Sequence, residues 1–489
     1  MRTRFPPSPT GMLHVGGLRT ALYSFLVAKQ TKGEFLLRIE DTDQAREVAG
    51  SVDAIVRGME WAGLTVDEGV MMIDGVISEK GTRGPYHQSK RLPIYRKYVD
   101  QLLASGDVYP CFCTAERLEK MRNDQAARHV APMYDRLCTK LSTEDIAAKI
   151  AAGEKHVIRM KVPHTETITF NDDIRGELSF KGHTIDDQVL LKSDGFPTYH
   201  MAHVVDDHLM DIDIVTRGEE WLSSLPKHLL LFRYLGWSPP RYAHVPLLFN
   251  KDKSKLSKRQ NSVSVDEYIE KGYLPEAMIN FLAMLGWNDG TTQELFSMDD
   301  LIEKFSLERV QKSGAIFDIE KLDWLQGQWM RTIPLDDFVA RIRPLVEENY
   351  PEAASDKDFT KKAALIQERI TFFKEAPDML GYFYKEPTVS MNLIASKKQK
   401  IEAADVPRLI KILIETLDAI SEKYWNEASI EAAIRAAMEK ESVKLGQLLW
   451  PLRAILTGRE YSPGAFEVAA VLGKGVTMKR LLTSAKEDL

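Results

Sequence analysis

The sequence has few of the features that would place a protein outside the cell or in a membrane. It contains three cysteines in 489 residues, too few for a framework of disulfides. No apolar run reaches the roughly 20 residues that a membrane-spanning helix needs, and no charged-then-apolar leader precedes the first motif. We therefore expect a protein of the reducing cytoplasm that has no membrane association.

Internal repeats, low-complexity tracts and an excess of basic residues are also absent. Lys and Arg total 65 against 71 Asp and Glu, which gives a formal net charge of -6. Because phosphate contacts need Lys and Arg, this balance argues mildly against a nucleic-acid partner unless basic residues gather on one face. The composition is that of a globular protein, and the length predicts several domains.

The stretch from Phe5 to Gly17 predicts a stiff loop that enters a helix. Its prolines restrict φ, and apolar residues recur at helical spacing in residues 18–26. His14, Gly16 and Gly17 are thereby expected at a helix N-terminus, where free amides and the helix dipole favour an anion. The alternative is a proline-rich entry to an ordinary surface helix.

A basic stretch near the middle of the chain, residues 249–259, predicts a cationic loop. Five Lys and Arg residues are interleaved with serines, directly after the strand-like run 244–248. Ammonium groups on flexible stems suit the neutralisation of negative charge. A solvated surface loop is the alternative for such a charge run.

Charged residues also follow two predicted strands. Glu40 comes at the end of the run 34–39, and Arg217 follows the strand predicted at residues 214–215. Strand ends of this kind form the ligand sites of open α/β sheets, and an arginine there can hold a carboxylate through two hydrogen bonds. Helix capping or loop solvation for the acidic run, and a surface ion pair with a neighbouring glutamate for Arg217, are the alternatives.

All three cysteines lie in one segment, at Cys111, Cys113 and Cys138. Clustered thiolates could hold Zn²⁺, which takes four soft or borderline ligands. Reduced cysteines that pack as small hydrophobes are the alternative.

Two signatures resemble those of class I aminoacyl-tRNA synthetases. The stretch 7–17, Pro-Ser-Pro-Thr-Gly followed by His14-Val-Gly-Gly17, is similar to the His-x-Gly-His signature in the form found in glutamyl-tRNA synthetases, with Gly17 replacing the second histidine. The stretch 255–259 resembles the Lys-Met-Ser-Lys-Ser signature, and the run 38–43 matches the Arg-Ile-Glu-Asp-Thr-Asp run of that subfamily. Their occurrence in order along one chain makes a strong match.

The resemblance implies a bacterial-type architecture that covers nearly the whole chain. Its catalytic domain is an α/β Rossmann-like domain with a parallel sheet, interrupted by an acceptor-stem-binding subdomain and followed by an all-α anticodon-binding region. The expected bounds are 1–95 and 186–250 for the two halves of the catalytic domain, 96–185 for the insertion, 251–334 for a stem-contact subdomain with the Lys-Leu-Ser-Lys-Arg loop, and 335–489 for the helical anticodon-binding domain.

The resemblance also implies an activity. A monomer would activate L-glutamate with ATP and Mg²⁺ to glutamyl-adenylate, and then transfer glutamate to the 3′ end of tRNA-Glu, with tRNA-Gln left open as a second acceptor. The implied catalytic residues are His14, Lys255 and Lys258. The implied ATP-binding residues are Pro7, Ser8, Pro9, Thr10, Gly11, His14, Gly16, Gly17, Lys255, Leu256, Ser257, Lys258 and Arg259. The implied glutamate-binding residues are Arg4, Ser8, Glu40, Tyr199, His203, Arg217 and Glu220.

For the cysteines, the resemblance implies the structural zinc of some bacterial members. The ligands would be Cys111, Cys113, Tyr134 and Cys138, because Tyr134 matches the Tyr-x-x-x-Cys pattern of a truncated relative. Lys140 stands where other members have a histidine. A phenolate is a poorer ligand than a thiolate, so zinc and metal-free thiols both stay open.

Other functions share parts of this pattern. A glutaminyl-tRNA synthetase has both signatures but β-barrels at its anticodon end, whereas helical spacing dominates after residue 335, as in the apolar stripe of residues 406–417. A small-molecule nucleotidylyltransferase of the same fold, or the relative that glutamylates an anticodon base, would be much shorter. A non-catalytic RNA-binding homologue would be expected to lose His14 or Lys258.

Overall fold

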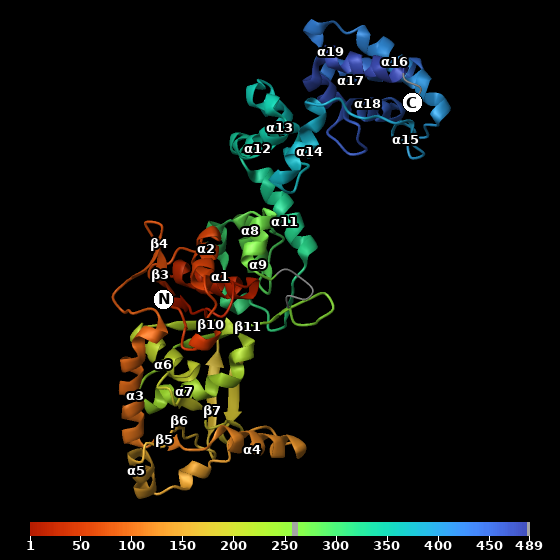
Figure 1. Ribbon diagram of the computed structural model, residues 1–489. Helices are drawn as coiled ribbons and strands as arrows, with labels where there is room; N and C mark the ends of the chain where they lie inside the picture. Colours follow the sequence, from red (N-terminus) through yellow and green to blue (C-terminus); the bar gives the residue numbers. More distant parts are fainter. Residues whose placement is uncertain (257–262, 487–489) are drawn as a thin grey trace. The chain divides into compact units, whose positions relative to one another are not determined.

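The structure, a computed structural model, describes residues 1–256 and 263–486. The chain divides into two compact units, Met1–Leu322 and Asp323–Leu489. The first combines strands and helices, whereas the described part of the second is helical (Figure 1). Among the helices of the described residues, none has both the length and the apolar character needed to cross a bilayer.

The first unit contains thirteen strands in its described residues. They are β1 (Thr3–Phe5), β2 (Phe35–Leu37), β3 (Glu68–Ile73), β4 (Val76–Lys80), β5 (Val108–Cys111), β6 (Val157–Met160), β7 (Thr167–Asp172), β8 (Gly176–Lys181), β9 (Val189–Leu191), β10 (Ile214–Gly218), β11 (Arg241–Val245), β12 (Leu248–Phe249) and β13 (Ala315–Ile316). Its helices are α1 (Val15–Gln30), α2 (Ser51–Trp61), α3 (Leu92–Ser105), α4 (Ala115–Ala127), α5 (Thr143–Ala151), α6 (Tyr199–Leu209), α7 (Leu225–Tyr234), α8 (Val265–Lys271), α9 (Pro275–Met284) and α10 (Met298–Lys304), and α11 (Ile319–Thr332) leads from this unit into the next.

Two sheets that adjoin at β1 organise this unit. β1, β2 and β3 pair in parallel, and β4 adds an antiparallel edge. On the other side, the Asp213 amide donates to the Arg2 carbonyl oxygen at 3.0 Å, so β10 and its parallel partner β11 continue the order beyond β1. The chain therefore leaves β1 and β10 in opposite directions across the two sheets, the arrangement that opens a ligand crevice at the strand ends.

The strand-like run expected over residues 244–248 is divided in the structure. β11 ends at Val245 and β12 begins at Leu248. Pro246 lies between them, and it has no amide proton to donate to a sheet ladder. The expectation of one continuous strand is therefore wrong.

A second set of strands and helices forms between β4 and β10. β5, β6 and β9 make an antiparallel sheet, and β7 and β8 form a hairpin. Side chains from α3, α6 and α7 pack against the sheet in a shared core that includes Val99, Val204 and Leu231. The hairpin is bonded back to β11, because the Asp173 amide donates to the Tyr242 carbonyl oxygen at 2.9 Å.

Buried ion pairs join α6 to β1, to the residue directly after β2 and to the turn before α3. Asp207 accepts from Arg4 Nε at 3.1 Å and from Arg38 Nη1 at 2.8 Å, and Asp206 accepts from Arg91 Nε at 2.7 Å. All five side chains are buried. Charges can stay in such an interior only while they are paired and hydrogen-bonded, so the five side chains depend on one another.

The described helices of the second unit form two groups. They are α12 (Leu335–Asn349), α13 (Phe359–Gln367), α14 (Ala376–Leu380), α15 (Met391–Ile394), α16 (Val406–Asp418), α17 (Glu427–Lys440), α18 (Leu445–Thr457) and α19 (Ala465–Lys486). One core joins α12, α13 and α14, and another joins α15 to α19 (Figure 1). The apolar stripe of α16 is confirmed as core packing, because Leu409, Leu413 and Leu417 are buried in that second group.

The buried ion pairs predict a large difference between two aspartates. Asp207→Ala leaves Arg4 and Arg38 without their shared partner, and we expect the first unit to lose roughly 3–5 kcal/mol of unfolding free energy. Asp211→Asn removes the charge from an ion pair between partly exposed Arg83 and an exposed carboxylate and suits the left-handed backbone at this position (φ 52°), so it should cost less than about 1 kcal/mol. Urea unfolding of both variants measures this, and equal losses would contradict the role given to Asp207.

Candidate active site

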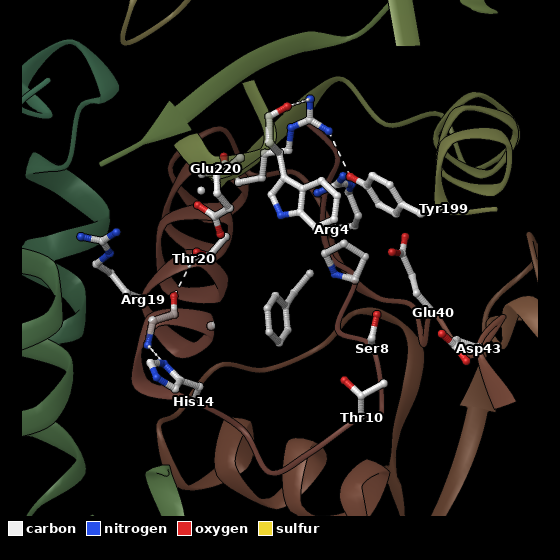
Figure 2. Close-up of a pocket in the computed structure, with 18 of the residues that line it drawn as sticks. Arg4, Ser8, Thr10, His14, Arg19, Thr20, Glu40, Asp43, Tyr199 and Glu220 are labelled. Atoms are coloured by element: carbon white, nitrogen blue, oxygen red, sulfur yellow. Dashed lines mark hydrogen bonds between the residues drawn. The ribbon is translucent and has the colours of Figure 1, made fainter. Parts of the chain in front are cut away.

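A cavity of about 680 Å³ opens where β1, β2 and β10 end (Figure 2). It brings together predicted residues that are far apart in the sequence: Arg4, Ser8, Thr10, His14, Gly16, Gly17, Glu40, Tyr199, Arg217, Glu220, Lys255 and Leu256. The predicted residues Pro7, Pro9, Gly11 and His203 are not among those that line it. Ser257, Lys258 and Arg259, also predicted, lie outside the described residues.

His14 caps the N-terminus of α1. Its Nδ1 accepts from the Gly16 amide at 2.9 Å, and the Val15 amide donates to the Val263 carbonyl oxygen at 2.8 Å. The expectation of free amides at this helix end is therefore wrong for Gly16, because its amide already donates a hydrogen bond to the imidazole. Since Nδ1 accepts, the neutral ring carries its own proton on Nε2, where it can donate to a phosphate oxygen.

The second signature begins beside the first. Lys255 forms an antiparallel bridge with Phe249 and lines the cavity, and the Leu256 amide donates to the Leu248 carbonyl oxygen at 3.0 Å. On the far side of the undescribed segment, Val263 accepts from the first turn of α1, as noted for His14. The described residues on either side of positions 257–262 are thus bonded to β12 and to the first motif.

Glu40 lies across the cavity from His14 (Figure 2). Its Oε1 accepts from Arg38 Nη2 at 3.1 Å and from Gln88 Nε2 at 3.4 Å. Burial raises the pKa of Glu40 to about 7, although the guanidinium groups of Arg38 and Arg4 act in the opposite direction. A cation that binds beside this carboxyl group would strongly stabilise its ionised form.

Arg217 projects into the same cavity from the end of β10. It donates from Nε to His244 at 2.9 Å and from Nη1 to the Tyr199 hydroxyl at 3.0 Å, and it is 5% exposed. Among the described residues no Asp or Glu forms an ion pair with it, which contradicts the surface ion pair considered from the sequence. Glu219 pairs with Arg175 instead. Arg217 is therefore a buried cation that faces a cavity without an anionic partner in the described chain.

Tyr199 and Arg4 line the same side of the cavity, and His203 lies behind Tyr199. Burial raises the pKa of Tyr199, so its hydroxyl keeps a proton to donate. Nη1 of Arg4 is buried and has no hydrogen-bond partner in the described residues. His203 is fully buried behind Tyr199, with the two rings stacked 5.2 Å apart, and its Nδ1 lies 3.2 Å from Asp207 Oδ2.

The predicted metal-binding side chains form a separate cluster near the end of β5. The Sγ atoms of Cys111, Cys113 and Cys138 all lie within 4.8 Å of one another, and those of Cys113 and Cys138 are 3.5 Å apart. The Tyr134 hydroxyl lies 3.4 Å from Cys111 Sγ and 3.3 Å from Cys113 Sγ. The structure thus brings together the four residues expected from the sequence.

The electrostatics of this cluster differ from one thiol to another. Burial opposes ionisation of Cys111, but hydrogen bonds from Tyr134 and Arg159 outweigh it and lower the pKa of that thiol. Burial raises the pKa of Cys113 to about 11, and the neighbouring thiols act in the same direction. A bound divalent cation would offset this effect of the neighbouring thiols on the pKa, because it stabilises all the thiolates at once.

Several residues of the cavity region were not predicted. Gln88 and Trp221 line the cavity, and His228 and His244 contact Arg217 from outside it. A signal for the histidines exists, since five of the 11 in the chain fall between residues 200 and 244. Nothing in the local pattern around Gln88 indicates its burial.

Two family models together match most of the chain. The catalytic domain of class I tRNA synthetases (E and Q) matches residues 1–324, and an anticodon binding domain matches residues 337–484. These ranges are consistent with an α/β unit followed by a helical one.

Similar proteins extend over the whole chain. The glutamate–tRNA ligase of Chlorobaculum parvum is 44% identical and that of Pelodictyon phaeoclathratiforme 45% identical, each over at least 98% of this chain and 97% of its own. The crystal structure of a glutamate tRNA ligase from Elizabethkingia meningosepticum in complex with its amino acid superposes with a TM-score of 0.87, at 35% identity over 99% of both chains. With its catalytic fold, its cavity residues and its relatives in agreement, the chain belongs to the glutamate–tRNA ligases of the class I synthetases.

Proposed function

We propose that the protein joins L-glutamate to the 3′ end of tRNA-Glu in two steps. The α-carboxylate of glutamate attacks the α-phosphorus of ATP, and the bond to pyrophosphate breaks to leave glutamyl-adenylate. A ribose hydroxyl of the tRNA then attacks the acyl carbon, and AMP leaves. One observation carries this proposal: the buried Arg217, without a carboxylate partner in the described residues, shares a cavity with His14 and Lys255.

Glutamate would lie across the cavity between opposite charges. Its side-chain carboxylate would meet Arg217 and the Tyr199 hydroxyl, with the unpartnered Nη1 of Arg4 nearby. Its ammonium group would contact Glu40 and stabilise the ionised form of that carboxyl group. Ser8 and Glu220 line the same space, and we assign them to the substrate as well, with His203 supporting Tyr199 from behind.

ATP would lie on the α1 side of the cavity. The Nε2–H of His14 would donate to a phosphate oxygen, and Lys255 and Lys258 would neutralise the charge that develops on pyrophosphate, while Mg²⁺ accompanies the nucleotide. Close approach to the helix start suits Gly16 and Gly17. The remaining residues assigned to ATP are Pro7, Ser8, Pro9, Thr10, Gly11, Leu256, Ser257 and Arg259.

Three parts of the chain would contact the tRNA. We assign its acceptor end to residues 96–185 and the stem to residues 251–334, whereas residues 335–489 would bind the anticodon. The helical nature of the described second unit disfavours a glutaminyl enzyme, whose anticodon end is built from β-barrels. We further propose that the protein acts as a cytoplasmic monomer.

The thiol cluster would hold Zn²⁺ as a structural ion. Cys111, Cys113 and Cys138 would supply three sulfur ligands, which their separations support, and Tyr134 would supply the fourth. The ion would tie the end of β5 to the loop that carries Tyr134 and Cys138.

Metal analysis tests the zinc assignment. The purified protein should contain about one zinc per chain, and Cys113→Ser should lose it, since that thiol contacts both Tyr134 and Cys138. Leu137→Ser, a change beside Cys138 at an exposed side chain, serves as a control that should keep the metal. A native protein purified without metal would refute the assignment.

Aminoacylation of purified tRNA-Glu and tRNA-Gln, assayed in parallel, tests the proposed activity. Glutamate should be attached to tRNA-Glu by the native protein. Arg217→Ala should raise the KM for glutamate by on the order of 100-fold, the loss of a bidentate charged contact, whereas Arg233→Ala, at an exposed ion pair outside the cavity, should not. Unaltered discrimination between glutamate and glutamine in the Arg217 variant would remove that assignment.

Glu40 predicts a pH dependence of glutamate binding. Its pKa of about 7 means that the carboxylate is mostly ionised at pH 8 and mostly protonated at pH 6, and only the carboxylate attracts an ammonium group. The KM for glutamate should therefore rise by about 10-fold from pH 8 to pH 6. Glu40→Gln should flatten this profile at a uniformly high KM, and a native KM that is constant over this range would exclude the role.

A further inference from the structure

Arg217 is held by two histidines, and each histidine is oriented by a hydrogen bond to a further side chain. The first is His244 on β11, whose Nε2 accepts from Arg217 Nε at 2.9 Å. A guanidinium only donates, so the proton of the neutral imidazole is on Nδ1, which lies 2.6 Å from Asp172 Oδ2 and donates to it. Burial lowers the pKa of His244, in keeping with a neutral ring.

The second histidine is His228 on α7. Its Nδ1 lies 3.2 Å from Arg217 Nη1 and accepts from it, so Nε2 carries the proton and donates to His200 Nδ1 at 3.1 Å. Burial lowers the pKa of His228 well below its usual value, and the neighbouring His203 and Arg217 act in the same direction. Both acceptors of Arg217 on these elements are therefore uncharged.

Two other buried arginines of the region differ from Arg217, because each has a carboxylate partner. Arg4 and Arg38 both donate to the carboxylate of Asp207, at 3.1 and 2.8 Å. Arg217 donates to four groups, but these are two imidazoles, the Tyr199 hydroxyl and, at 3.4 Å from Nη2, the Trp221 carbonyl oxygen, all of them neutral. Its direction is thereby set while its positive charge stays uncompensated, and an uncompensated charge in a buried site attracts an anion strongly.

We propose that His228 and His244 are positioning residues that make the site select an acidic side chain over its amide. The inference rests on the proposed function, in which Arg217 receives the side-chain carboxylate of the substrate. A carboxylate in place of either imidazole nitrogen would pair with Arg217 as Asp207 pairs with Arg4, and the site would then hold a neutral amide about as well as an acid. Asp172, at the end of β7, brings the inserted hairpin into this arrangement.

Two isosteric pairs of variants separate charge from shape. His228→Asn and His228→Asp place an oxygen acceptor near the position of Nδ1, neutral in one and charged in the other, and His244→Gln and His244→Glu do the same for Nε2. We expect the KM for glutamate to be about 10- to 100-fold higher in each carboxylate variant than in its amide counterpart. The preference for glutamate over glutamine should fall by the same factor, with a smaller change in kcat.

The outcomes distinguish this inference from the proposed function. If each carboxylate variant matches its amide counterpart in KM and in selectivity while Arg217→Ala loses glutamate, the inference is wrong and the function stands. If Arg217→Ala keeps its glutamate KM, the proposed role of Arg217 itself fails. Unfolding midpoints and the KM for ATP report whether each variant is folded.

A further comparison decides the case where both carboxylate variants fail to fold. His228→Leu lacks any acceptor for Arg217, whereas His228→Asn retains one. The KM for glutamate should be about 10-fold higher in the leucine variant, the cost of one charged hydrogen bond. Equal KM values in these two variants would overturn the inference.

Discussion

The pairing of buried arginines with Asp206 and Asp207 is the constraint on which the rest of the catalytic unit depends. These carboxylates lie in α6, but their partners come from β1, from the residue directly after β2 and from the turn before α3. An ion taken from water costs several kcal/mol unless its partner is in place. The elements that surround the cavity therefore have to assemble together, and Arg4 is held at its edge as a result.

The same region holds charges in three different states. Arg38 is fully compensated by carboxylates, Arg217 is surrounded by neutral acceptors, and Glu40 is close to its pKa at neutral pH. The difference follows from what each side chain contacts rather than from its residue type. The site thus has one cation without an anionic partner among the described residues and one carboxyl group near its pKa. It is complementary to a molecule that carries both an anionic and a cationic end, as an acidic amino acid does.

Local patterns predicted the parts of the site that rest on local structure. His14 follows from a proline-rich entry to a helix, and Glu40 and Arg217 follow from the ends of strands. Asp207 and His244 could not be predicted in the same way, because their roles come from side chains more than 25 positions away. The division of the run 244–248 at Pro246, and the use of the Gly16 amide by His14, are consequences of backbone geometry that residue spacing does not show.

Backbone hydrogen bonds join Leu13 and Val15 to the residues that follow the second signature. Val15 donates to Val263, and Val265 donates to Leu13, while Leu256 is fixed on Leu248. The described residues on each side of positions 257–262 are therefore anchored by backbone hydrogen bonds, on one side to β12 and on the other to the start of α1. Loss of the hydrogen bonds at Val263 and Val265 would let the start of α1, and His14 with it, shift relative to Lys255 without any change in either side chain.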